Sequence, residues 1–201
     1  MNIDIREETK AIEEQVEAIV EKILVNQDKF KISTFHLSEL PESNNWENHP
    51  NIDPIFKRHV EKLDTYKKDC LYWFSCEDAE KATILNNALN QYRTKYSGRN
   101  DYRVVPTSNQ YNSDTNIIYV GVRRGSTAKN PKCTNIIGRI NQHLGYYKQR
   151  KTQGLQLLHW AKYLDIDVTL HVVHFNDELG SLLYVIEKAI AKELVPHCGR
   201  H

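Results

Sequence analysis

Three residues in the second half of the chain have side chains suited to chemistry on a phosphate. Arg139 and His143 are four residues apart in "NIIGRINQHLGYY", so a helix places them on one face, one turn from each other. Arginine holds phosphate oxygens with a planar fork, and histidine exchanges a proton near neutral pH. Glu187 follows Ile186 on a strongly apolar helix, where a carboxylate is costly unless it is paired or binds a cation. The pattern predicts a phosphate site with a metal ligand; a solvated Arg and His pair and a glutamate paired with lysine is the alternative.

A fourth candidate is Tyr119, which interrupts the apolar run "IIYVGV" and is followed by Arg123 and Arg124. A phenol has a pKa near ~10 and acts as a base only where nearby positive charge lowers that pKa. Arg139 and His143 supply such charge if the strand lies beside their helix. Tyr119 is therefore either a core side chain or the group that faces a reacting phosphate.

Charge is segregated along the chain although the net charge is only +1. Residues 115–164 contain nine Lys and Arg residues and no Asp or Glu, whereas the first 25 residues contain seven acidic and three basic residues. A long basic segment without acids is typical of a surface that binds phosphates. The alternative is that these side chains scatter over several faces or pair with acids elsewhere in the chain.

Elements that would position these residues follow from the hydrophobic periodicity. Helices are expected over 4–25, 53–68, 77–96, 135–149, 155–164 and 179–194, and strands over 70–76, 102–106, 116–122 and 167–175. Residues 26–52 carry many turn formers and are expected to be irregular. This order predicts a mixed α and β fold, and the pattern alone allows either an antiparallel α+β sheet or a parallel one.

Length and composition narrow the classes of protein further. A chain of 201 residues with 40% hydrophobic residues suits one domain with an N-terminal extension. We expect a helical extension over 1–68 and a main domain over 69–201. No apolar run is long enough for a membrane span or a signal peptide, which favours a cytoplasmic protein. The four cysteines show no metal-binding or disulfide spacing, so reduced thiols are expected.

In this order, the motifs resemble the GIY-YIG nuclease family. "YVG" at 119–121 is similar to the second half of the name motif, and "CLY" at 70–72 is a degenerate form of the first half. The helix with Arg139 and His143 is similar to that of the restriction-enzyme branch. Glu187, followed nine residues later by Pro196, matches the end of the family's glutamate helix. The resemblance covers residues 69–201.

This resemblance implies a small, mostly antiparallel central sheet flanked by helices, and a metal-dependent endonuclease that hydrolyses phosphodiester bonds in DNA. It implies catalytic roles for Tyr119, Tyr72, Arg139, His143 and Glu187. Glu187 would also bind Mg²⁺ or Mn²⁺, hard ions that accept few protein carboxylates and keep several waters. The expected contacts to DNA are the basic residues Arg123, Arg124, Lys129, Lys132, Lys148, Arg150 and Lys151.

Several positions depart from the family pattern. Cys70 replaces a glycine of the first motif, residues 76–115 separate the two half-motifs, and an asparagine usual after the proline is absent. These departures are consistent with a second hypothesis, a catalytically inactive nucleic-acid-binding module of the same fold. A third hypothesis is a non-enzymatic protein that binds a partner through its acidic N-terminal helix. That helix also suggests a homodimer.

Overall fold

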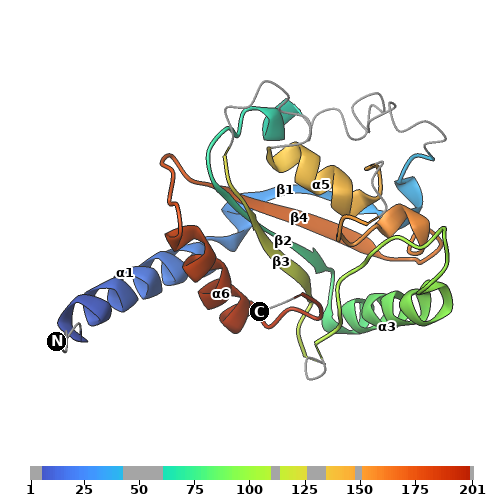
Figure 1. The fold of residues 1–201 in the computed structure, drawn as a ribbon, viewed down its shortest axis with the longest axis horizontal. Coiled ribbons are helices and arrows are strands. Elements are labelled where there is room, and N and C mark those ends of the chain that lie inside the picture. Colours follow the sequence, from blue (N-terminus) through green and yellow to red (C-terminus); the bar gives the residue numbers. More distant parts are fainter. Residues whose placement is uncertain (1–5, 43–60, 110–113, 126–134, 148–150, 200–201) are drawn as a thin grey trace.

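The protein is described by a computed structural model over residues 6–42, 61–109, 114–125, 135–147 and 151–199, and its centre is a four-stranded antiparallel sheet (Figure 1). The strands lie in the order β1-β4-β2-β3. Their bounds are Lys31–His36 (β1), Cys70–Cys76 (β2), Ile117–Arg123 (β3) and Asp167–His174 (β4). The expected α+β class is thus confirmed, and the sheet is antiparallel rather than parallel.

Helices cover both faces of the sheet. Side chains of α3 (Ala79–Tyr96) and α5 (Ile136–Leu144) pack on one face. Side chains of α1 (Arg6–Val25) and α6 (Leu182–Leu194) pack on the other. Every residue of β2 is buried, because this central strand contributes alternate side chains to both layers. The aromatic run at 70–76 therefore reads as a continuous apolar strand.

The prediction that residues 26–52 are irregular is wrong for β1. Ser33 and Phe35 of this strand are buried, and the strand pairs with β4 through Thr34 opposite Thr169. The two threonine hydroxyls are 2.8 Å apart. The alternation of "KISTFH" is short and lies beside many turn formers, which obscured it in the sequence. The sheet consequently uses residues on both sides of the predicted boundary at residue 68.

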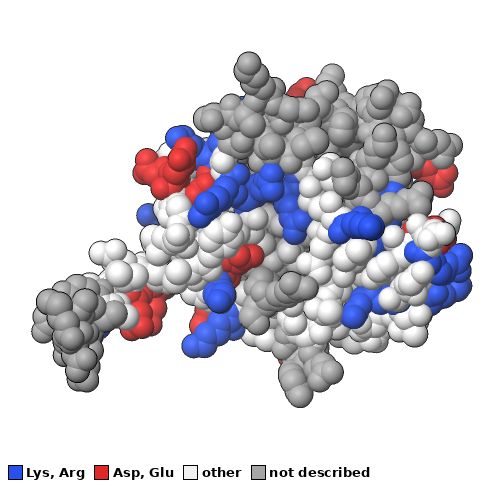
Figure 2. All heavy atoms as spheres, in the orientation of Figure 1, with Lys and Arg blue, Asp and Glu red and all other residues white. Residues whose placement is uncertain are grey.

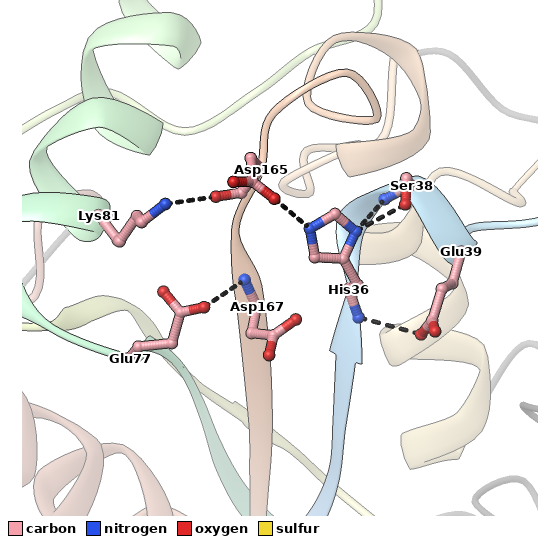
Figure 3. A network of polar contacts seen from close by, with 7 residues as sticks. All are labelled: His36, Ser38, Glu39, Glu77, Lys81, Asp165 and Asp167. Atoms are coloured by element: carbon pink, nitrogen blue, oxygen red, sulfur yellow. Dashed lines mark hydrogen bonds and ion pairs between the residues drawn. The ribbon is translucent and has the colours of Figure 1, made fainter.

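Polar contacts join β1 to β4 and to the start of α3 (Figure 3). His36 Nε2 lies 3.1 Å from Asp165 Oδ1, and the backbone N–H of His36 donates to Glu39. Lys81 donates to the backbone oxygen of Asp165 at 2.6 Å. The carboxylate of Glu77 accepts from the backbone N–H of Asp167 at 3.0 Å. These contacts fix the chain where it leaves β1 and where it enters β4.

Several helix bounds differ from those expected. The helix predicted over 135–149 ends at Leu144, because Gly145 adopts φ +105°, a left-handed conformation that glycine accepts at a helix end. Residues 155–164 form only the 3₁₀ turn η4 (Leu157–His159) and further turns, and 102–106 form no strand. The final helix starts at Leu182 rather than residue 179. Residues 61–64 are helical, while 53–60 lie outside the described residues.

The last described residues run along β3, at the edge of the sheet. The backbone N–H groups of His197 and Cys198 donate to the carbonyl oxygens of Ile117 and Ile118 at 2.9 and 3.0 Å. Cys198 is buried, and its thiol also donates to the oxygen of Ile118. The thiols of Cys70, Cys76 and Cys198 are free, as expected. In the described part of the chain, no helix has both the length and the apolar character that a bilayer crossing requires.

Candidate functional site

Four of the predicted site residues meet between β2, β3 and α5. Arg139 Nε donates to the Tyr72 hydroxyl at 2.9 Å, and Arg139 Nη2 donates to the Tyr119 hydroxyl at 3.2 Å. His143 Nε2 lies 3.0 Å from the same Tyr72 hydroxyl. The ring centroid of His143 is 4.6 Å from that of Tyr119. Two tyrosines, one arginine and one histidine therefore form a single cluster, built from residues 72 to 143.

Hydrogen bonding assigns the proton of His143. The backbone N–H of Leu155 donates to Nδ1 at 3.1 Å, so Nδ1 carries a lone pair. Burial, together with the charge of Arg139, holds the pKa of His143 well below its usual range, so the ring is neutral at pH 7. Its proton is then on Nε2, which donates to Tyr72. The Tyr72 oxygen thus accepts two hydrogen bonds, from Arg139 and from His143.

The two phenols differ in their access to solvent. Tyr72 is fully buried, whereas Tyr119 is 9% exposed. Burial raises the pKa of both hydroxyls above the usual value, and Arg139 opposes this rise through its charge and its hydrogen bonds. Tyr119 adds to the rise at Tyr72. Arg139 is therefore the described group that most favours a negative oxygen on either tyrosine.

Most donors of Arg139 are used inside the protein. Nη1 donates to the side-chain oxygen of Gln142 at 2.9 Å and to the backbone oxygen of Gln153 at 2.8 Å. With the bonds to Tyr72 and Tyr119, four of the five N–H groups have acceptors. Among the described residues, the second N–H of Nη2 has no acceptor. Arg139 therefore holds the two tyrosines in place through hydrogen bonds inside the protein.

Arg139 and His143 do not project into solvent, as a solvated pair on a surface helix would. His143 is fully buried, as are most residues of α5. Residues after the helix cover its other side: Gly154 approaches so closely that a Cβ there would lie 2.8 Å from the backbone oxygen of Gln142. The polar face of the helix therefore turns toward the tyrosines of the sheet and not toward solvent.

Gly121 leaves the space that this cluster needs. It lies directly opposite Tyr72 in the β2–β3 pairing. A Cβ at this position would lie 2.6 Å from the Tyr72 hydroxyl oxygen and 2.8 Å from Cε1 of Tyr119. The "YVG" and "CLY" segments are thus neighbours in space, although residues 76–115, which include α3, separate them in the sequence.

Glu187 approaches the cluster from the opposite face of the sheet. It is half-buried on α6, and the backbone N–H of Val122 on β3 lies near its carboxylate. Burial raises the pKa of the carboxyl, while Arg139, Val122 and Lys188 lower it. Because β3 is the last strand of the sheet, α6 on one face and α5 on the other both reach its edge. Glu187 and Arg139 therefore interact at this edge.

The donor set limits how a metal ion would be held. Among the described residues, no three His, Cys, Asp or Glu side chains come together as a metal-binding group. A hard divalent ion with one carboxylate ligand is nevertheless a normal arrangement, because Mg²⁺ keeps several waters and shares phosphate oxygens. Glu187 could supply this one carboxylate ligand. It lies near the cluster, and Arg139 is only one of the groups that stabilise its ionised form.

Of the predicted DNA-binding residues, three are described. Arg124 and Lys151 are exposed, and Arg123 is half-buried. Figure 2 shows Lys and Arg side chains near the end of β3 and α6, and others elsewhere on the same face. The remaining predicted contacts lie outside the described residues: Lys129, Lys132, Lys148 and Arg150.

Two residues that support the site were missed in the sequence. Gln142 is buried and orients Arg139; its spacing of three from Arg139 places it on the same helical face, which is a usable signal. Asp69 is 2% exposed and accepts from the backbone N–H groups of Gly125 and Leu179, both at 2.8 Å. An acid directly before a buried strand is the only sign of this role in the sequence.

Comparisons with protein-family models, with curated proteins and with solved structures gave no match for this chain. The geometry of the cluster is therefore the basis for a functional conclusion.

Proposed function

We propose that the protein is a divalent-metal-dependent endonuclease that hydrolyses phosphodiester bonds in DNA. The observation that carries the proposal is the meeting of Tyr72, Tyr119, Arg139 and His143 in one hydrogen-bonded cluster, with Glu187 interacting electrostatically with it. These are the residues that the resemblance to GIY-YIG nucleases assigns to the reaction. These residues come from four different elements, β2, β3, α5 and α6. Phosphodiester hydrolysis requires such side chains to lie close to one another.

Each side chain has a role in the proposed reaction. Tyr119, the less buried phenol, accepts a hydrogen bond from the attacking water and so orients it, and the proton of that water passes to solvent. Tyr72 accepts from Arg139 and His143 and so positions both. The free N–H of Arg139 binds a non-bridging phosphate oxygen. Water attacks phosphorus, the bond to the 3′ oxygen breaks, and that oxygen takes a proton from solvent.

Glu187 would hold the divalent ion at the edge of β3. When bound, such an ion polarises the phosphate and stabilises the charge on the leaving oxygen. Burial raises the pKa of the Glu187 carboxyl, and the charge of Arg139 and the N–H of Val122 oppose this rise by stabilising the ionised form, which is the form that binds a cation. Arg123 and Arg124 follow Val122 directly and would contact the flanking phosphates.

The test is cleavage of supercoiled plasmid DNA in the presence of Mg²⁺ or Mn²⁺. We expect Arg139→Ala and Glu187→Ala to reduce the cleavage rate by about 100-fold or more, since each removes a charged group from the transition state. Glu193→Ala is the matched control, because Glu193 is an exposed glutamate on the same helix. Circular dichroism checks that each variant is folded.

Removing the metal with a chelator should abolish cleavage by the parent protein. Cleavage that both Arg139→Ala and Glu187→Ala retain at the parent rate would contradict the proposal. Loss of cleavage in Glu193→Ala as well would indicate a general effect on α6 instead.

The internal bonding of Arg139 favours a second function, a nucleic-acid-binding module without hydrolytic activity. Four of its N–H groups are already satisfied by the protein, which suits a structural role. This alternative predicts DNA binding that weakens steeply with salt, and no metal-dependent cleavage.

A further inference from the structure

An exposed aromatic side chain lies on the first turn of α6. Tyr184 is 47% exposed and the next residue, Val185, is 48% exposed. Both residues therefore lie outside the buried face of this apolar helix. The neighbours Leu183 and Ile186 are fully buried and fix this turn against the sheet. The ring of Tyr184 is thus held on the surface by a rigid element.

Arg124 stacks on this ring. Its guanidinium carbon lies 5.2 Å from the centroid of Tyr184, within the range of a cation–π interaction. Arg124 is exposed and follows β3 directly. The two residues are 60 positions apart in the sequence, yet they form one exposed surface of an aromatic ring and a planar cation. We refer to Arg124 and Tyr184 as the stacking pair.

A buried carboxylate brings the two halves of the stacking pair together. Asp69, at the start of β2, accepts from the N–H of Gly125 with one oxygen and from the N–H of Leu179 with the other. Gly125 is next to Arg124, and Leu179 precedes α6. A Cβ at Gly125 would lie only 2.5 Å from the backbone oxygen of Lys67, so this loop is packed closely against the chain. The hydrogen bonds of Asp69 and the close packing at Gly125 therefore hold the two residues of the stacking pair near each other.

The stacking pair adjoins the candidate catalytic site. Tyr184, Glu187 and Lys188 are spaced by three and four residues, so they share one face of α6, where such neighbours are about 5–6 Å apart at Cβ. Directly after β3, Arg124 is two residues from Val122, whose N–H lies near the Glu187 carboxylate. Lys188 is exposed. In a DNA strand with one phosphate near Glu187, a neighbouring base would lie over the ring of Tyr184.

We propose that the stacking pair binds an unpaired base, so that the preferred substrate is DNA with unpaired nucleotides at the position of cleavage. This inference rests on the proposed function. Aromatic rings flanked by cations bind single strands, because every exposed base has a face to stack on, whereas the bases of an intact duplex are stacked on one another. Arg124 and Lys188 complement the charge of the adjoining phosphates.

The test measures affinity for two labelled DNA duplexes of the same sequence, one fully paired and one with a short bulge of unpaired nucleotides. Fluorescence anisotropy in a chelating buffer reports binding without cleavage. We expect the parent protein to bind the bulged duplex about 10-fold more tightly. Tyr184→Leu should lose this preference, and Tyr184→Phe should keep it because the ring remains.

Tyr163→Leu is the matched control, since Tyr163 is 92% exposed and lies outside the stacking pair; its preference should be unchanged. Equal binding of both duplexes by the parent protein, or a preference that Tyr184→Leu retains, would overturn the inference. The plasmid assay separates the two proposals. A Tyr184-dependent preference without cleavage leaves the inference standing and removes the hydrolytic function, and cleavage without the preference does the reverse.

Discussion

At the scale of single residues, the cluster depends on a close approach that only glycine allows. Gly121 lies opposite Tyr72 across β2 and β3, and the hydroxyl of that tyrosine occupies the space of a side chain. The glycine of the "YVG" segment is thus explained by packing, since its backbone angles are open to other residues. The absence of a side chain at Gly121 allows the Tyr72 hydroxyl oxygen to lie between Arg139 and His143.

Gly121→Ala should therefore damage the site. The added methyl group overlaps Tyr72 and Tyr119, so we expect the free energy of unfolding to fall by about 1–3 kcal/mol and plasmid cleavage to fall sharply. Urea denaturation and the cleavage assay measure the two effects. Gly98→Ala is the control for the activity: a Cβ there contacts nothing within 4 Å, and the strain of an alanine at φ +86° lowers stability without touching the cluster, so activity should persist. Full activity in Gly121→Ala would contradict the role given to this glycine.

Residue types in the sequence predicted the members of the cluster but not their bonding. The spacing of Arg139 and His143 placed both on one face of a helix, and this is what the structure has. Spacing carries no information on the other side of that helix. Residues 153–155 close over α5, where Gln153 supplies an acceptor to Arg139 and Leu155 supplies a donor to His143. This tertiary contact leaves no local signal in the sequence.

At the scale of elements, Asp69 links three segments: the start of β2, the loop after β3 and the chain before α6. Its two hydrogen bonds satisfy backbone N–H groups that are otherwise without an acceptor among the described residues. Arg124 and α6, which carries Glu187, are therefore held relative to β2 by one carboxylate.

Asp69→Ala should lower the free energy of unfolding by about 2–4 kcal/mol, because it leaves two N–H groups unpaired in a buried place. Asp64→Ala removes an exposed ion pair with Lys67 and should cost less than about 1 kcal/mol. Urea denaturation compares the two variants. Equal costs would show that Asp69 does not hold these segments together.

Elements were predicted best where the pattern was long and continuous. The apolar run of β2, the periodic helix α3 and the alternating strand β4 appear close to the expected bounds. The helix expected over 135–149 ends at Leu144 because Gly145 terminates α5, a signal present in "HLGYY". Strand β1 was missed because its stability comes from pairing with β4, a partner far away in the sequence.

At the scale of the whole molecule, buried neutral histidines connect stability to pH. His171 is 9% exposed and stacks on Trp73, with centroids 4.7 Å apart. Burial lowers the pKa of His171 to about 4; Lys31 adds to this, while the backbone of Gln27 and Asp28 oppose it. Burial likewise lowers the pKa of His143 and His197. The folded protein therefore resists protonation at these rings.

The free energy of unfolding should fall as the pH falls. Above about pH 6.5 His171 is neutral in both states; below it the unfolded chain binds a proton and the folded chain does not, until pH reaches about 4. This difference corresponds to about 3 kcal/mol for His171. Urea midpoints across this range measure it. His171→Phe keeps an aromatic ring on Trp73 and should show a shallower dependence; an unchanged slope would contradict the assignment.

Charge segregation was readable from the sequence, but its placement was not. The acidic helix α1 carries exposed Glu13, Glu14 and Glu17, and its first half extends away from the sheet (Figure 1). Lys and Arg side chains lie at several places on the face shown in Figure 2, among them the region near β3 and α6. Dimerisation through α1, whose Ile12 is 53% exposed, stays a prediction.

The short run of chain after α6 has a consequence for solubility. An outer strand with unpaired carbonyl groups is a template on which other molecules add, and this leads to aggregation. Here His197 and Cys198 occupy the carbonyl groups of Ile117 and Ile118. A variant cut before His197 would uncover the apolar edge of the strand that bears Tyr119. By pairing with these carbonyl groups, His197 and Cys198 leave fewer unpaired groups on this edge to which another copy of the chain could add.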